Sequence, residues 1–122
     1  QIRLNVIDRN ASKDISDICR KHGITLIAWG ALADGLLTGK FKTYTTFPDD
    51  DHRRRMPEFS GDRFMQYIKI VELLDQLAIS MGRSVSHLAL RWVLDSAPFN
   101  CSLFGAKTDK QVEENILAYV SC

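Results

Sequence analysis

The chain has 122 residues, enough for one domain of ordinary size or for a piece of a larger one. Its 16 basic and 15 acidic residues leave a formal net charge of +1, which gives no electrostatic case for binding nucleic acid. No apolar stretch approaches the roughly 20 residues that cross a bilayer and no charged-then-apolar leader opens the chain, so we expect a cytoplasmic protein.

The first third of the chain predicts two strands with a helix between them. Residues 1–7 alternate apolar and polar side chains, as a strand does. Helical spacing of apolar residues follows a Ser12 cap, and Gly23 ends that helix. Residues 24–29 form a continuous apolar run, which is typical of a parallel strand covered on both faces.

The middle of the chain predicts a loop region and then a long helix. A glycine-punctuated stretch, 30–40, leads into a long polar loop at about 41–61. A helix is expected from 62 to 81, and Gly82 stops it. Its predicted packed face consists of Phe64, Ile68, Val71, Leu74, Leu77, Ala78 and Met81.

The last third predicts helix, strand and helix. Ser84 caps a helix over 85–94, and Pro98 breaks the chain before a short strand at 101–104. Thr108 starts the final helix with the spacing of a capping box and the helix reaches about Val120. The face expected to pack holds Val112, Ile116 and Tyr119.

Strands separated by helices imply parallel pairing with right-handed crossovers, so the fold class is α/β. Three such units do not close a barrel, which takes eight. An open parallel sheet would also expose two edges. The fold therefore looks incomplete alone, and self-association through the edges or joining to another part of a protein is expected.

Two segments have features of a nucleotide site, because ligands of α/β proteins bind at the carboxyl ends of strands. After the second strand, Trp29 offers a ring for stacking, glycines free the backbone amides, and Lys40 adds charge. From spacing alone, the favoured explanation of that segment is a simple turn with a buried tryptophan and a solvated lysine. The turn into the last helix places Lys107 beside free amides, with Gln111 on one face with Glu114 and Asn115. An ordinary amphipathic helix is the alternative there.

Gln1 and Asn5 are polar residues on an apolar strand, and they need either a ligand carboxamide or partners within the protein.

No metal site or catalytic centre is predicted. Cys19, Cys101 and Cys122 read as small buried residues in a reducing compartment. His22, His52 and His87 have no ligand-like spacing, and His87 is expected to be a packing residue. The run 49–51 of aspartates reads as a solvated loop.

Three segments together resemble the aldo-keto reductases over residues 1–122. They are "HGITLIAWGALADGLLTGKF", "HLALRWVLDSAP" and "FGAKTDKQVEEN", and the first carries Gly30-Ala31 where the family commonly has Ser-Pro. The resemblance implies the last three units of a (β/α)8 TIM barrel that binds NADP(H) and reduces aldehydes or ketones, small-molecule carbonyl substrates. It further implies that the proton-delivering Asp, Tyr, Lys and His of the family lie on strands before the start of this chain.

The resemblance assigns cofactor roles residue by residue. Gln1 matches the contact to the nicotinamide carboxamide, and Trp29 matches the ring that stacks on the nicotinamide. The remaining matches line the pyrophosphate loop, the 2′-phosphate site and the adenine site; they are Gly30, Leu32, Gly35, Leu37, Lys40, Arg53, Gly105, Lys107, Gln111, Glu114 and Asn115. Tyr44, Phe47 and Phe59 are expected as substrate-pocket residues. The alternatives are a non-catalytic nucleotide-binding or regulatory module and a ligand-free self-associating fragment.

Overall fold

A computed structural model describes residues 1–10, 13–96 and 99–120 and contains one three-stranded sheet. The strands are β1 (Ile2–Arg3), β2 (Leu26–Trp29) and β3 (Phe99–Ser102). They lie in the order β1-β2-β3, and both neighbouring pairs are parallel. The predicted α/β class and partial barrel are confirmed. The predicted Ser12 cap, Pro98 and Cys122 lie outside the described residues.

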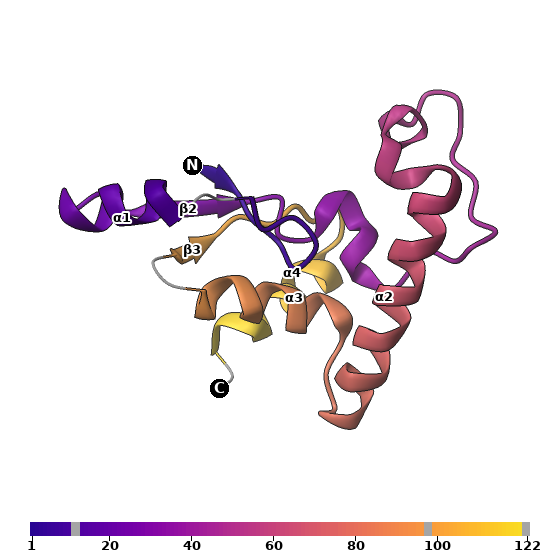
Figure 1. The fold of residues 1–122 in the computed structure, drawn as a ribbon. Coiled ribbons are helices and arrows are strands. Elements are labelled where there is room, and N and C mark those ends of the chain that lie inside the picture. The colour runs from indigo at the N-terminus through magenta and orange to yellow at the C-terminus, as the bar shows by residue number, and fades with distance from the viewer. Residues whose placement is uncertain (11–12, 97–98, 121–122) are drawn as a thin grey trace.

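Four α-helices accompany the sheet. Figure 1 shows α3 lying below the strands, α2 standing to one side of them, and α1 projecting past their ends. Ser84 caps α3 as predicted, since its hydroxyl accepts a hydrogen bond from the His87 amide at 3.2 Å. The helices are α1 (Lys13–Lys21), α2 (Gly61–Ser80), α3 (Val85–Asp95) and α4 (Asp109–Val120).

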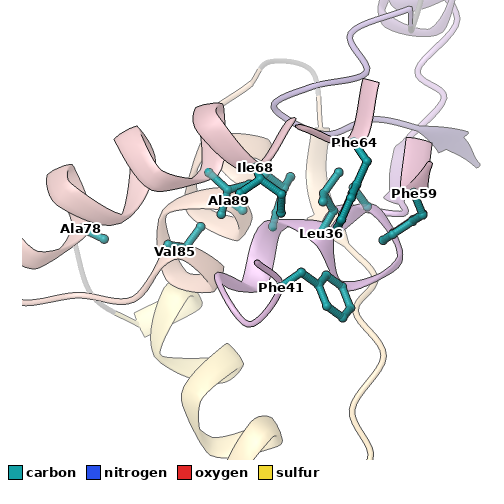
Figure 2. Packing of buried hydrophobic residues seen from close by; sticks show 11 residues of the cluster. Leu36, Phe41, Phe59, Phe64, Ile68, Ala78, Val85 and Ala89 are labelled. Atoms are coloured by element: carbon teal, nitrogen blue, oxygen red, sulfur yellow. The ribbon is translucent and has the colours of Figure 1, made fainter. Parts of the chain in front are cut away.

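The larger of two hydrophobic cores lies between α2, α3 and the turn η1 (Ala33–Thr38) that follows β2. Figure 2 shows Leu36 and Phe64 meeting in this core, with Ile68 and Ala89 beside them. The second core joins the sheet to α3 and α4; its buried members are Leu4, Cys19, Leu26, Ala28, Ala31, Leu90, Val93 and Ala118. Together the cores fix the turn after β2 against the helices.

The first strand is shorter than the alternation of residues 1–7 predicts, because Asn5 turns the chain. Its Oδ1 accepts hydrogen bonds from the amides of Ile7 (3.0 Å) and Asp8 (2.7 Å), while its Nδ2 donates to the Gly30 carbonyl at 3.0 Å. Asn5 is fully buried. Its amide therefore has partners within the protein, and these bonds tie the end of β1 to the end of β2.

The second strand is covered on one face only. Leu26 and Ala28 are buried in the second core, whereas Ile27 is half-buried and Trp29 is 41% exposed. Among the described residues β2 is therefore not covered on both faces as expected, because the three strands form one layer and α3 and α4 pack against one side of it. Side chains that alternate to the other face remain open to solvent.

The packed face of α4 also differs from the prediction. Asn115 and Ala118 are buried, whereas Val112 and Ile116 are exposed. α4 lies along α3, and the small side chain of Ala118 allows close approach at that contact. Of the predicted face, Tyr119 makes a tertiary contact, since its hydroxyl donates to the Ser102 carbonyl.

Two further elements differ from the prediction: α2 in which side chains it buries, and β3 in the residue at which it begins. α2 buries Phe64, Ile68, Val71 and Ala78 as expected, but Leu77 and Met81 of the predicted face are exposed. The third strand begins at 99 instead of 101.

The 41–61 loop is partly structured. It contains the 3₁₀ turns η2 (His52–Arg55) and η3 (Pro57–Phe59). Phe41, Phe47 and Phe59 pack edge to face, with ring centroids 5.3–5.8 Å apart, and attach the loop to the larger core.

Candidate functional site

A cavity of about 1040 Å³ lies at the carboxyl ends of β2 and β3. Its walls come from the turn after β2, the 48–53 part of the long loop, and the turn that opens α4. The predicted site residues that line it are Trp29, Gly30, Leu32, Gly35, Lys40, Arg53, Gly105, Lys107, Gln111, Glu114 and Asn115. Segments more than 70 residues apart in the sequence are thus brought to one cleft, as the prediction requires.

Two predicted site residues lie elsewhere. Gln1 is exposed at the start of the chain and does not line the cavity. Leu37 belongs to the turn η1, and its side chain is fully buried in the larger core. Their direct cofactor contacts remain predictions.

The turn after β2 needs glycine at its sharpest point. Gly35 has φ of +92°, and it follows Ala33 and Asp34, which also have positive φ (48° and 56°). A Cβ on Gly35 would lie 3.3 Å from both Cε and Nζ of Lys40. The glycine therefore allows the left-handed backbone and leaves room for the Lys40 side chain to cross the turn.

Three cations converge on the cavity: Lys40, Arg53 and Lys107. Burial lowers the pKa of Lys40 below that of an ordinary lysine, and the charges of Arg53 and Lys107 lower the pKa further. Mutual repulsion of this kind is relieved when an anion binds between the cations. The cleft therefore offers three cations that can pair with phosphate groups, beside the carboxylates of Asp34, Asp50, Asp51 and Glu114.

Arg53 is already held by the protein. Its Nε and Nη2 donate to the two carboxylate oxygens of Asp51 at 2.9 and 2.5 Å, and these bonds hold the pKa of Asp51 well below its usual range. The guanidinium carbon also lies 5.2 and 5.1 Å from the ring centroids of Phe41 and Phe47. This fixes Arg53 at the cavity wall before any ligand binds.

The start of α4 is preorganised as well. Thr108 accepts a hydrogen bond from the Gln111 amide at 3.3 Å, and the Gln111 side chain accepts from the Lys107 amide at 2.7 Å. The Thr108 bond is the predicted cap, whereas the return bond from Gln111 goes to the amide of Lys107, one residue before Thr108. Asn115 is buried at the cavity wall one turn further along.

Some lining residues had no signal in the sequence. The Asp34 carboxylate accepts a hydrogen bond from the Arg3 guanidinium at 3.4 Å, and it lies 3.7 Å from the His52 imidazole. These contacts join residues up to 31 positions apart in the sequence. Ser86 and Phe104 reach the cavity from α3 and the end of β3. Since all of these contacts depend on tertiary structure, no local spacing predicts them.

The residues expected to shape a substrate pocket are dispersed. Phe47 and Phe59 belong to the aromatic group of the long loop, and Tyr44 is 82% exposed. None of the three lines the large cavity. Phe59 lines a second cavity of about 300 Å³.

Other expected features lie away from the cleft. His87 is buried in α3, and burial, followed by the charges of Arg83 and Arg91, lowers its pKa. Cys19 is buried and Cys101 half-buried, both as free thiols. Within 1–10, 13–96 and 99–120 no three His, Cys, Asp or Glu side chains are grouped to hold a metal. No helix in these ranges is long and apolar enough to span a membrane.

Comparisons with a family model, with individual proteins and with solved structures all identify the same family. The model of the Aldo/keto reductase family matches residues 1–121. The aldo-keto reductase YhdN of Bacillus subtilis is 38% identical over 89% of this chain and 33% of its own length. The aldo-keto reductase yakc [NADP(+)] of Schizosaccharomyces pombe is 30% identical over 80% of this chain and 28% of its own length. The solved glycerol dehydrogenase AKR11B4 of Gluconobacter oxydans superposes with a TM-score of 0.83 at 40% identity, over 93% of this chain and 35% of that one. The chain thus spans about a third of the length of these relatives.

Proposed function

The chain belongs to the aldo/keto reductase family, and we propose that it supplies the NADP(H)-binding walls of an oxidoreductase that reduces aldehydes or ketones. The observation that carries the proposal is the convergence of Lys40, Arg53 and Lys107 on the cleft that Trp29 borders. A dinucleotide with three phosphates needs several cations and a flat apolar surface, and the cleft offers both. The printed name of one relative, yakc [NADP(+)], supports the same cofactor.

Within this cleft each group has a proposed task. Lys40 and Arg53 face the pyrophosphate, while Lys107 binds the 2′-phosphate beside the start of α4. Glu114 and Asn115 contact the adenine. The bound cofactor supplies the hydride, and Trp29 stacks on its nicotinamide ring.

The proton for the carbonyl oxygen comes from outside this set. Among the described residues that line the cleft there is no tyrosine, and His52 is the one histidine, with a side chain 71% exposed. We therefore assign this chain to cofactor binding and orientation, and we place the acid that completes reduction on another part of a barrel.

Fluorescence titration of the chain with NADPH tests the proposal. Lys107→Glu should weaken NADPH binding by at least about tenfold, because a hydrogen bond to a charged group contributes roughly 1.5–3 kcal/mol. NADH, which lacks the 2′-phosphate, should be affected much less. Lys110→Glu is the matched control, since Lys110 is exposed in the first turn of α4, three residues after Lys107, and does not line the cavity. Equal losses in both variants, or no saturable binding to the unmodified chain, would contradict the proposal.

A nucleotide-binding module without catalysis is the second candidate, and the composition of the cleft wall is consistent with it. The two are separated by joining the chain to the amino-terminal two thirds of a full-length relative. Oxidation of NADPH by added aldehydes supports the reductase, whereas tight binding without oxidation supports the module. Sedimentation of the chain with and without NADPH would reveal a ligand-free oligomer.

A further inference from the structure

Arg3 stands beside Trp29 at the end of the sheet. The two residues are paired in register on β1 and β2, and the Arg3 guanidinium carbon lies 5.3 Å from the centroid of the Trp29 ring. Trp29 is 41% exposed at the end of its strand, so the orientation of its ring depends on its neighbours. Arg3 is the cation that covers it.

Two carboxylates hold Arg3 in this place. Its Nε lies 3.3 Å from Asp8, which follows β1, and its Nη2 lies 3.4 Å from Asp34, which follows β2. The Arg3 side chain is 28% exposed. Because a planar guanidinium can face two carboxylates at once, it links the two loops in a way that a lysine ammonium would do less well.

The position of Gly30 fits this arrangement. A Cβ there would lie 3.4 Å from the Arg3 Cγ and 3.7 Å from its Nη1. At these distances a Cβ would be in ordinary van der Waals contact with Arg3, so the two residues lie close together. Gly30 itself has φ of +68°, a left-handed backbone that favours glycine.

Arg3 and Trp29 border different cavities. Arg3 lines the 300 Å³ cavity and not the large one, whereas Trp29 lines the large cavity and not the small one. The guanidinium therefore contacts the indole without lining the cleft itself. The ring remains accessible from the cleft.

We propose that Arg3 is a positioning residue that fixes the indole of Trp29 for stacking on the nicotinamide. This inference rests on the proposed cofactor function. It assigns Arg3 no contact with the cofactor, and its effect passes through the ring. Removal of the guanidinium should free the indole and lower NADPH affinity roughly threefold to tenfold, as expected for loss of one cation–π contact and the order it imposes.

The chain offers a matched control, because its two tryptophans each carry one arginine. The Arg9 guanidinium lies 5.0 Å from the centroid of the Trp92 ring, and Arg9 lines neither cavity. Arg9→Leu therefore removes the same kind of contact away from the cleft. Arg3→Lys keeps a cation near Trp29 but weakens the double carboxylate link.

Fluorine NMR of the chain labelled with 5-fluorotryptophan reports both rings, with Trp92→Phe giving the assignment. Without cofactor, Arg3→Leu should shift and broaden the Trp29 resonance and leave the Trp92 resonance in place. Arg9→Leu should do the reverse and leave NADPH affinity unchanged. Arg3→Lys should restore part of both the resonance and the affinity.

Three results would overturn the inference. The first is an unaltered Trp29 resonance in Arg3→Leu, and the second is an altered resonance with unchanged NADPH affinity. The third is an equal loss of affinity in Arg9→Leu, which would indicate general loosening. If the unmodified chain binds no NADPH, the proposed function fails, while the cofactor-free spectra still decide whether Arg3 orients Trp29.

Discussion

Asp51 holds Arg53 through both of its carboxylate oxygens, and this ion pair belongs to the long loop and lines the cleft. The Arg53 guanidinium also donates toward the Asp34 carbonyl at 3.5 Å, so it reaches from η2 to η1. A residue that the sequence assigns to cofactor phosphates thus also holds the wall of the site together. Its two roles can be separated by experiment.

The Asp51 pair predicts a pH dependence of stability. Because the pKa of Asp51 is lowered in the folded state, mainly by hydrogen bonds from Arg53, its stabilisation is present above the pKa of an unfolded aspartate, about 3.9. It is lost as the pH falls from there toward the lowered value. Thermal unfolding from pH 6 to pH 2 should show a steeper acid loss in the unmodified chain than in Asp51→Asn. Asp50→Asn is the control, and it should follow the unmodified chain; if all three profiles coincide, the pair does not stabilise the fold.

Lys40 predicts a pH dependence of binding. Its pKa is lowered chiefly by burial, and a bound phosphate would favour its charged form. NADPH affinity should therefore decrease as the pH rises through the alkaline range below 10.5, the value of an ordinary lysine. Titrations at several pH values check this. In Lys40→Arg the decline should be absent, and a decline of the same size in that variant would show that another group is responsible.

Gly35→Ala should weaken cofactor binding by disturbing Lys40. The substitution places a methyl group at a φ of +92° and 3.3 Å from the end of the Lys40 side chain. Gly82→Ala has a comparable backbone penalty, with φ of +65°, but no neighbour within 4 Å. Both variants should lose about 1–2 kcal/mol of unfolding free energy. Only Gly35→Ala should lose NADPH affinity, and equal affinities would argue against a role for the Lys40 position.

Leu37→Ala should act on stability and not on binding. Leu37 is fully buried in the larger core, and truncation of such a leucine costs roughly 2–5 kcal/mol. Urea unfolding measures that loss. NADPH affinity of the folded protein at low temperature should remain near that of the unmodified chain. A large drop in affinity with little loss of stability would instead support the direct cofactor contact that the family resemblance implies.

The order of elements and most of the cleft could be predicted from the sequence. Local signals, such as the apolar run before Trp29 and the Thr108–Gln111 cap, place the strand end and the helix start. In a parallel sheet those two points necessarily meet at one edge. The grouping of Lys40 with Lys107 therefore follows from topology together with the family motifs.

The sequence could not predict which faces are covered. Helical periodicity identifies an apolar stripe, but in α4 the packed side is that of Asn115 and Ala118, chosen by the fit against α3. The early end of β1 had a similar cause. The local sequence around Asn5 is compatible with a longer strand, but in the folded chain the Asn5 side chain donates a hydrogen bond to the carbonyl of Gly30, 25 residues away. Such choices depend on neighbours that only the folded chain brings together.

Every residue that lines the large cavity comes from positions 29–115, an uninterrupted stretch of 87 residues. Under the proposed function, most of the residues assigned to cofactor binding therefore lie in this one stretch, with Gln1 as the predicted exception. Transplanted between related barrels, this block is expected to carry its preference between NADPH and NADH with it, together with whatever the 41–61 loop contributes to substrate selection. The choice of reducing cofactor would then be set by one continuous part of the chain, and the proton that completes reduction would come from another part of the barrel.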